Sequence, residues 1–400
     1  MPSRATPPIG SRADQGIRQA AHIPIGDLRC DDVPACEIVH PLPVRGAMCA
    51  GQAGKSSTRT RPSAGPAFST DGRAQTRMRR SRGGAAPIIG HVNSPDDLIS
   101  LLLTNDQLIA RGFTSQNISR AVGSGDLIRL RPGFYVEGRA RDLDRRDRHL
   151  LSILAADAAL DAPVFSHSSA ALIHGLPDWG LPLHRVAVSE EGPAPRPRTT
   201  SLTTFRTAPG LSDEVMTVNG LRVTTPARTV TDIAISTPRD AAVAVADAAL
   251  HREIVTRDAL DESLRRSAGR RGIRRARQSL SFADGRSESV AESLSRLTFH
   301  DFGLPEPEPQ VDIFTSRGVR VARVDFLWRE FGVIGECDGF GKYFDGLSPG
   351  ETRHRLGMEK DRDAELMALG YRVRHWRWRD VQEPRVLAAR IKRVLFATAA

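Results

Sequence analysis

Two acidic residues near the C-terminal end of the chain have the spacing of a metal site. Residues 320–328 and 333–338 alternate like strands, and residues 329–332 between them predict a hairpin loop. If the last residue of the first strand pairs with the first of the second, Asp325 lies opposite Glu336, with Cβ atoms about 4.5–5.5 Å apart. Like charges so placed destabilise a strand pair, whereas a divalent cation removes that penalty. The pair therefore predicts Mg²⁺, or Mn²⁺, bound for phosphodiester hydrolysis.

Two further residues are candidates for the same predicted metal-dependent hydrolysis. Glu292 lies four residues after Glu288 in a predicted helix and is a candidate third carboxylate. Lys342 is the lysine near the pair in sequence, and an ammonium there would stabilise a pentacovalent phosphate. The alternative for Lys342 is a solvated loop position. The same strand register places Asp338 opposite Arg323, which predicts a cross-strand ion pair.

A basic, aromatic strand follows at residues 371–378, after a helix predicted over 359–369 that ends at Gly370. Arg374 and Arg377 are candidates for contact with a phosphate backbone. The two tryptophans of the strand have the flat faces that stack on bases, but core packing is the favoured interpretation for both.

The elements before this region predict a small helical domain at residues 93–140. Thr104 and Thr114 are predicted N-caps, and a glycine turn ends the helix that Thr114 begins. Two alternating runs around Pro132 and Gly133 then predict a hairpin. Three helices followed by a hairpin is the order of a winged helix, in which the third helix enters the DNA major groove.

Exposed polar residues of that third helix and the arginines of the hairpin are the predicted DNA contacts. Base edges and phosphates are the expected partners of the helix, and phosphates those of the hairpin. The alternative is a winged helix used for protein contacts, with these residues forming an ordinary solvated face. The predicted contact residues are Ser115, Gln116, Asn117, Arg120, Arg129 and Arg131.

Residues 144–265 read as a small mixed α/β domain, and residues 266–286 as a basic helical linker that is a candidate for phosphate contact. His167, His174 and Asp232 in the α/β region are of types that bind metals. Their spacing matches no known ligand geometry, so helix capping is the favoured interpretation.

Residues 1–92 are rich in Pro, Gly, Ser and Arg, lack apolar periodicity and predict a disordered basic leader. They hold thirteen basic and six acidic residues, a net charge of +7 out of +10 for all 400 residues. The favoured interpretation is an over-extended reading frame whose true start is at or near Met78. The alternative is a DNA-binding arm centred on residues 77–82.

The composition favours a protein with an anionic partner and argues against a membrane-spanning or secreted protein. The pI of about 10.2 favours an anionic partner such as nucleic acid, here double-stranded DNA. The longest apolar stretch, residues 241–250, is interrupted by Asp247 and is far shorter than the roughly 20 residues of a membrane-spanning helix. No secretory signal and no cysteine framework is recognisable, so a cytoplasmic protein without membrane contact is expected.

Several motifs in residues 94–265 resemble AbiEi-type antitoxin-like proteins of actinobacteria. The matching stretches are LTNDQLIARGFTSQNISRAVGSGDLIRLRPGFYV, SHSSAALIHGLP, VNGLRVTTPARTVTDIA and VADAALHREIVTRDAL. The resemblance implies a winged helix followed by a small α/β domain. It also implies a type IV toxin-antitoxin system, in which the antitoxin binds promoter DNA and counters a nucleotidyltransferase-like toxin.

Residues 287–382, within a domain predicted over 287–398, resemble the PD-(D/E)XK nucleases near the very short patch repair endonucleases. The matching stretches are SESVAESLSR, GLPEPEPQ, RVDFLW, GECDGFGKYFD and EKDRDAELMALGYRVRHW. The resemblance implies that Asp325 and Glu336 are the metal-binding acids, Glu292 the helical acid and Lys342 the displaced motif lysine. Asp338 stands where that lysine is expected, which leaves catalysis in doubt.

The sequence therefore predicts a multidomain α/β protein: a winged helix, a small mixed α/β domain and a restriction-endonuclease-like α/β domain. Three functions remain open. The first is a DNA-binding, antitoxin-like transcriptional regulator with a nuclease-like C-terminal domain. The second is an active Mg²⁺-dependent endonuclease, and the third a non-catalytic protein-interaction module.

Overall fold

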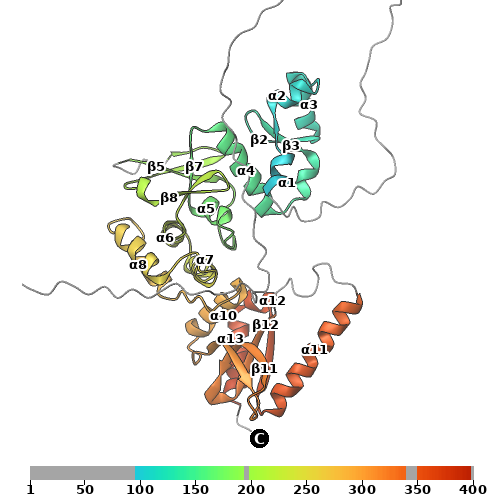
Figure 1. Cartoon of the computed structure of the whole chain (residues 1–400), viewed down its shortest axis with the longest axis vertical. Helices are drawn as coiled ribbons and strands as arrows, with labels where there is room; N and C mark the ends of the chain where they lie inside the picture. Colours follow the sequence, from blue (N-terminus) through green and yellow to red (C-terminus); the bar gives the residue numbers. More distant parts are fainter. Residues whose placement is uncertain (1–94, 193–197, 339–348, 398–400) are drawn as a thin grey trace, which may run out of the picture. The chain divides into compact units, whose positions relative to one another are not determined.

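A computed structural model describes residues 95–192, 198–338 and 349–397, and the leader predicted at residues 1–92 lies outside them. In these ranges the protein is a mixed α/β chain with three separate β-sheets and thirteen α-helices (Figure 1). Among the described residues, none of the helices has the length and apolar character needed to span a bilayer.

Three helices and a small antiparallel sheet form the first folded segment. Thr104 caps α2 through a reciprocal hydrogen-bond pair with Gln107, as a capping box requires. Leu108, Ile118 and Tyr135 are buried between the helices and the sheet, whose strand order is β1-β3-β2. The elements are α1 (Pro95–Leu101), β1 (Leu103–Thr104), α2 (Asn105–Ala110), α3 (Ser115–Ser124), β2 (Leu127–Arg131), β3 (Phe134–Glu137) and the 3-10 helix η1 (Gly138–Asp142).

A six-stranded mixed sheet follows, in the order β6-β7-β5-β4-β9-β8. The pairs β5–β7 and β4–β9 are parallel and the other pairs antiparallel. Phe165, Val188 and Val223 are buried on this sheet against α4 and α5. The elements are α4 (Arg145–Ala159), β4 (Val164–Phe165), α5 (His167–Ile173), β5 (Val186–Glu191), β6 (Arg198–Thr199), β7 (Thr203–Ala208), the 3-10 helix η2 (Ser212–Glu214), β8 (Val215–Val218) and β9 (Leu221–Thr224).

Four helices then build a core of their own: α6 (Pro226–Ser236), α7 (Arg239–His251), α8 (Arg257–Arg266) and α9 (Ile273–Leu280). Helix α6 begins at Pro226 because Thr225 caps it and proline is favoured at the first position of a helix. Val245 of α7 and Leu280 of α9 belong to the same buried cluster, so the segment predicted as a linker contributes to this core.

The last segment is a four-stranded sheet in the order β10-β11-β12-β13, with the final pair parallel. Trp328 and Trp376 are buried with α10 and α13 on one face, and Leu366 of α11 is buried on the other (Figure 1). The elements are α10 (Val290–Asp301), β10 (Glu308–Phe314), β11 (Arg320–Trp328), the 3-10 helix η3 (Arg329–Phe331), β12 (Val333–Asp338), α11 (Pro349–Ala368), β13 (Arg372–Arg377), α12 (Trp378–Val381) and α13 (Pro384–Leu395).

Candidate functional site

Helix α3 presents the predicted DNA-contact residues to solvent. The helix begins at Ser115 because the Thr114 side chain accepts a hydrogen bond of 3.2 Å from the backbone N–H of Asn117. It ends at Gly125, whose φ of 82° is the left-handed cap that glycine adopts most readily. Ile118 faces the core. The exposed residues of the helix include Ser115, Gln116, Asn117 and Arg120.

The two hairpin arginines differ in exposure. The predicted hairpin is confirmed, because β2 and β3 pair antiparallel with Arg129 opposite Tyr135. The register shifts between Arg129 and Arg131, and a local irregularity of this kind redirects side chains. Arg129 is exposed, whereas Arg131 is half-buried and its burial lowers the pKa of its guanidinium. Arg129 is therefore the better placed of the two for a phosphate.

The strand register that carries the acid-pair prediction is present, with Trp328 paired to Val333 and Phe326 to Gly335. Asp325 comes next along β11. Its carboxylate accepts one hydrogen bond of 2.7 Å from the backbone N–H of Cys337 and one of 3.3 Å from the Gln310 side-chain amide.

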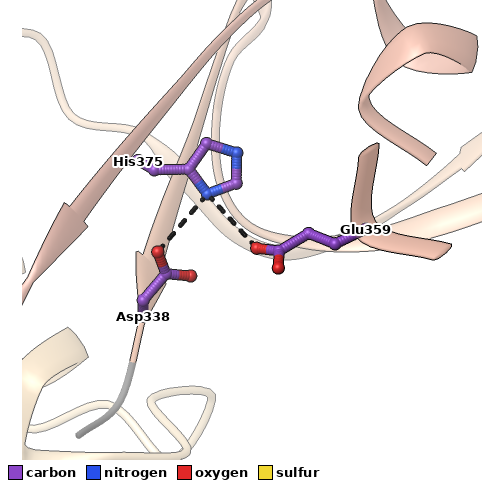
Figure 2. Close-up of side chains that lie close together, drawn as sticks. All are labelled: Asp338, Glu359 and His375. Atoms are coloured by element: carbon purple, nitrogen blue, oxygen red, sulfur yellow. Dashed lines mark ion pairs between the residues drawn. The ribbon is translucent and has the colours of Figure 1, made fainter. Parts of the chain in front are cut away.

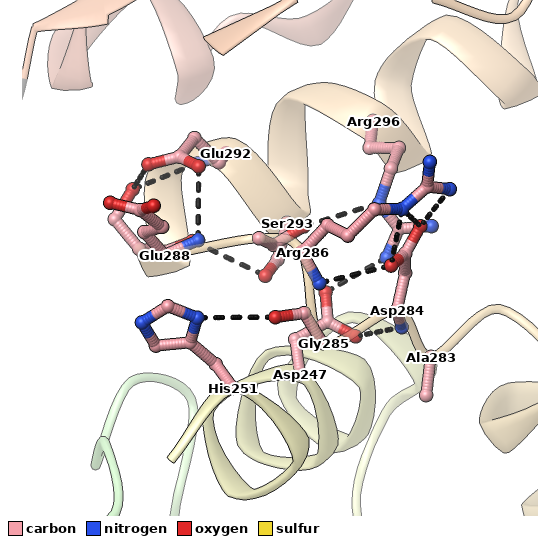
Figure 3. Close-up of polar contacts among 12 residues, drawn as sticks. Asp247, His251, Ala283, Asp284, Gly285, Arg286, Glu288, Glu292, Ser293 and Arg296 are labelled. Atoms are coloured by element: carbon pink, nitrogen blue, oxygen red, sulfur yellow. Dashed lines mark hydrogen bonds and ion pairs between the residues drawn. The ribbon is translucent and has the colours of Figure 1, made fainter. Parts of the chain in front are cut away.

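Glu292 lies beside Asp325, as the sequence predicts. The Gln310 amide that donates to Asp325 also donates to Glu292, at 2.9 Å, so one group bridges the two carboxylates. Glu292 is held at the start of α10 by the backbone N–H of Glu288 and the hydroxyl of Ser289, and Figure 3 shows it against Glu288. Burial, and next the charge of Asp325, raise the pKa of Glu292.

Glu336 is 5% exposed, and its carboxylate lies 3.7 Å from the Arg362 guanidinium of α11. Cross-strand pairing places Glu336 beside His375 of β13. Lys342, the fourth predicted catalytic residue, lies outside the described residues. Gln310 thus links Glu292 and Asp325, whereas Glu336 contacts Arg362 of α11.

The cross-strand ion pair predicted between Asp338 and Arg323 is wrong. Asp338 lies 3.6 Å from His375, and Arg323 lies 3.1 Å from Glu288. The reason is that β13 joins the sheet beside β12 and supplies its own partner to Asp338. The predicted hairpin contained only β11 and β12, so it could not reveal the parallel pairing of β12 with β13.

The basic strand β13 divides its residues between solvent and core. Arg374 and Arg377 are exposed, as phosphate contact requires. Trp376 is 1% exposed and donates a hydrogen bond of 2.9 Å to the Ser295 hydroxyl. Core packing is therefore confirmed for Trp376, which leaves its ring no free face for a base.

Three polar residues near Asp338 escaped the sequence reasoning: Glu359 and Asp363 of α11, and His375 of β13. The His375 Nε2 lies 2.8 Å from the Asp363 carboxylate, and its Nδ1 faces Asp338 and Glu359 (Figure 2). A hydrogen bond with Asp338, and then the charges of Asp363 and Asp338, raise the pKa of His375 to about 9. The four-residue spacing of Glu359 and Asp363 on a helix is the signal that sequence reasoning had available.

The middle segment buries a separate polar cluster. His167 and Asp232 lie 4.0 Å apart in the core, and Arg228 and Arg270 pair with the same aspartate at 3.0 and 2.6 Å. Burial lowers the pKa of His167 to about 4. His174 is bonded to the backbone carbonyl of Thr224 at 2.7 Å. These contacts are structural, but they are not the predicted helix caps. Asp232 lies inside α6, and His167 and His174 bond to the Ser166 hydroxyl and to a strand carbonyl.

A buried ion pair joins α7 to α10 (Figure 3). Asp247 is 1% exposed, and its carboxylate lies 2.8 Å from the Arg296 guanidinium. The same carboxylate accepts a hydrogen bond of 2.7 Å from the backbone N–H of Asp284. Burial raises the pKa of Asp247, and the charge of Arg296 opposes that shift.

Comparison with known protein families classifies the region that contains the exposed face of α3 and the six-stranded sheet. Residues 101–138 match a family described as "Transcriptional regulator, AbiEi antitoxin", and residues 162–282 match the "AbiEi antitoxin C-terminal domain". The expected resemblance to AbiEi antitoxins is therefore confirmed, and it points to a regulator or antitoxin.

Two individual proteins are similar to this chain over a longer stretch than the family matches cover. The uncharacterized proteins MT2308 and Rv2248 of two Mycobacterium tuberculosis strains are each 33% identical to this chain over 285 residues. The match covers 71% of this chain and 97% of each relative. The chain belongs to the same family as these mycobacterial proteins, and two of its regions are of the AbiEi antitoxin type.

Proposed function

We propose that this protein is an antitoxin-like transcriptional regulator that binds double-stranded DNA through residues 93–140. In this proposal the segment is a winged helix, with α3 in the major groove and the β2–β3 hairpin against the phosphate backbone. The single observation that carries it is the solvent-exposed polar face of α3 next to the exposed guanidinium of Arg129. The match of residues 101–138 to a transcriptional regulator supports the same role.

The rest of the proposed organisation follows from this role. Residues 144–265, together with helix α9 that packs on them, would form the AbiEi-like domain, and residues 287–398 a nuclease-like domain. The functional counterpart would be a nucleotidyltransferase-like toxin, as the type IV antitoxin systems imply. Growth of cells that express such a toxin, with and without this chain, tests that link.

DNA binding is tested by fluorescence anisotropy with a duplex from upstream of the protein's own gene and an unrelated duplex. We expect Arg129→Ala to weaken binding to both duplexes and to reduce the slope of log K against log salt by about one. Gln116→Ala and Asn117→Ala should weaken binding to the upstream duplex more than to the other, because base contacts carry the sequence preference.

The matched control is Arg265→Ala on α8, an arginine whose side chain is 68% exposed and lies outside the proposed interface. It removes the same charge from the chain. If Arg265→Ala and Arg129→Ala changed the salt slope equally, the effect would come from net charge and the proposed interface would be wrong.

A second candidate function is Mg²⁺-dependent hydrolysis of DNA phosphodiesters by the C-terminal segment. It is favoured by the bridged pair Glu292 and Asp325, because two carboxylates held close together, with the pKa of one of them raised, are a common mark of a functional site. Asp325 and Glu336 would hold the ion, whose hard oxygen ligands these acids provide. When bound, it would polarise the phosphate and activate a water.

Plasmid nicking with Mg²⁺ or Mn²⁺ separates the two functions. The enzyme hypothesis expects nicking by the natural chain and none by the double variant Asp325→Ala, Glu336→Ala. Equal nicking by both proteins, or none by either, together with retained DNA binding, would leave the regulator and exclude this site as a nuclease.

A further inference from the structure

A mixed cluster of one imidazole and two carboxylates lies at the carboxyl end of β12. Asp338 ends this strand, Glu359 lies on α11, and His375 lies on the neighbouring strand β13. One ligand atom from each of the three lies within 4.8 Å of those of the other two. Figure 2 shows the His375 Nδ1 facing both carboxylates, at 3.6 Å from Asp338 and 3.9 Å from Glu359.

These separations are close to those of a metal centre. Two ligands that are each about 2.0–2.1 Å from Zn²⁺ at the tetrahedral angle lie about 3.4 Å from each other. The two distances from the His375 Nδ1 exceed that spacing by only a few tenths of an ångström, and the two carboxylate ligand atoms lie within 4.8 Å of each other, so small side-chain rotations would bring the three together. All three residues are half-buried, so the cluster is reachable from solvent.

The second nitrogen of the imidazole is already oriented. Asp363 lies one helical turn after Glu359, and its carboxylate is 2.8 Å from the His375 Nε2. A carboxylate on the far nitrogen fixes the ring plane and the tautomer of a metal-binding histidine, and directs the other nitrogen to the metal. The arrangement therefore has an outer partner as well as three inner ligands.

We propose that Asp338, Glu359 and His375 bind a divalent transition-metal ion of the Zn²⁺ type, with Asp363 as the positioning residue for His375. The chemistry of the donors separates this site from the Mg²⁺ site predicted at Asp325 and Glu336. Imidazole nitrogen favours Zn²⁺ and similar ions, whereas Mg²⁺ is held by oxygen atoms alone. Three protein ligands leave the fourth position open to water or to a phosphate oxygen.

The test is Zn²⁺ titration of the full chain in competition with a chromophoric chelator. Cys30, Cys36 and Cys49 are replaced by Ser in every protein, so that thiolates outside the described residues do not compete for the ion. We expect one Zn²⁺ per chain, resistant to excess Mg²⁺, and affinities at least about tenfold lower for His375→Ala, Glu359→Gln and Asp338→Asn.

His354→Ala is the matched control, because His354 is an exposed histidine on the same helix α11 and lies outside the cluster. It should bind as the parent does. Zn²⁺ should also raise the melting temperature of the parent and of His354→Ala, and not that of Glu359→Gln.

The proposal is wrong if the parent takes up no Zn²⁺, or if Glu359→Gln and Asp338→Asn bind it as tightly as the parent. These two near-isosteric variants decide the matter even where His375→Ala fails to fold. DNA binding and plasmid nicking do not enter the measurement, so its outcome is independent of both functions proposed above.

Discussion

Gly335 of β12 lies against two buried tryptophan rings. A Cβ atom at this position would be 2.5 Å from the Cη2 atom of Trp376 and 3.0 Å from the ring of Trp328. Both tryptophans are at most 2% exposed and are packed with Phe299 and Phe326. The rings have no room to withdraw, so the absent side chain is a packing requirement of this core.

We expect Gly335→Ala to lower the free energy of unfolding by about 1–3 kcal/mol, because overpacking forces strain on the rings. Gly357→Ala on α11 is the matched control. Its added methyl group meets nothing within 4 Å and should raise stability by roughly 0.5–1 kcal/mol through helix propensity. Urea unfolding followed by tryptophan fluorescence measures both, and equal effects of the two variants would contradict the packing argument.

The raised pKa of Glu292 predicts a pH dependence of stability. Burial and the Asp325 charge make the folded protein bind this proton more tightly than the unfolded chain does. Stability should therefore fall as the pH rises from the ordinary glutamate pKa, about 4.3, through the raised value. Glu292→Gln removes this slope, which urea unfolding at a series of pH values detects. Parallel pH profiles for the two proteins would show that Glu292 makes no such contribution.

The sequence predicted the positions of two of the acidic residues in the C-terminal segment. The hairpin spacing placed Asp325 and the four-residue helix spacing placed Glu292, because both depend on local geometry. The sequence did not predict that Gln310 bridges Asp325 and Glu292. Gln310 lies on β10 and has a left-handed φ of 56°, a conformation that the residue type does not predict. His375 was missed because its neighbours depend on a long crossover.

At the scale of elements, α7 and α10 are joined by charge as well as by packing. The Asp247 carboxylate is almost fully buried, and the Arg296 side chain is 11% exposed. A buried carboxylate without its cation has to bear the cost of desolvation alone. The pair therefore ties the four-helix core to the C-terminal segment.

We expect Arg296→Met to lower the free energy of unfolding by about 3–5 kcal/mol, because it leaves Asp247 buried and unpaired. The control is Arg286→Met, which breaks the ion pair between Arg286 and Asp284. Because the Arg286 side chain is 62% exposed, this change should lower the free energy of unfolding by at most about 1 kcal/mol. Urea unfolding measures both. If adding Asp247→Asn to Arg296→Met recovered none of the loss, the buried charge would not be its cause.

Helix ends were the most predictable elements. Thr104 and Thr114 cap helices as expected, because capping depends mainly on the residue itself. Strand order was not predictable. In the six-stranded sheet, β4 and β6 have two residues each and are defined by their partners more than by their own pattern.

For the molecule as a whole, the distribution of charge separates the first 92 residues from the rest. They carry +7 of the total +10, and the remaining 308 residues carry +3. Non-specific affinity for DNA scales with the number of cations that replace counterions. A DNA-binding arm in these residues therefore predicts a measurable contribution to the salt dependence.

If residues 77–82 form a DNA-binding arm, a chain that lacks residues 1–92 should show a shallower slope of log K against log salt for an unrelated duplex. Its preference for the upstream duplex should be retained, because the proposed base contacts lie on α3. Anisotropy over a range of salt concentrations compares the two chains. An unchanged slope would exclude the arm.

The parallel pairing of β12 with β13 has a consequence for the order in which the protein is made. A ribosome completes the proposed DNA-contact segment early, and N-terminal domains generally fold first during synthesis. Asp338 and His375 belong to strands separated by all of α11, so β12 and β13 can pair fully only after residue 377 has been translated. A truncated product of translation would therefore keep the proposed operator-binding segment and lack the proposed metal ligand His375.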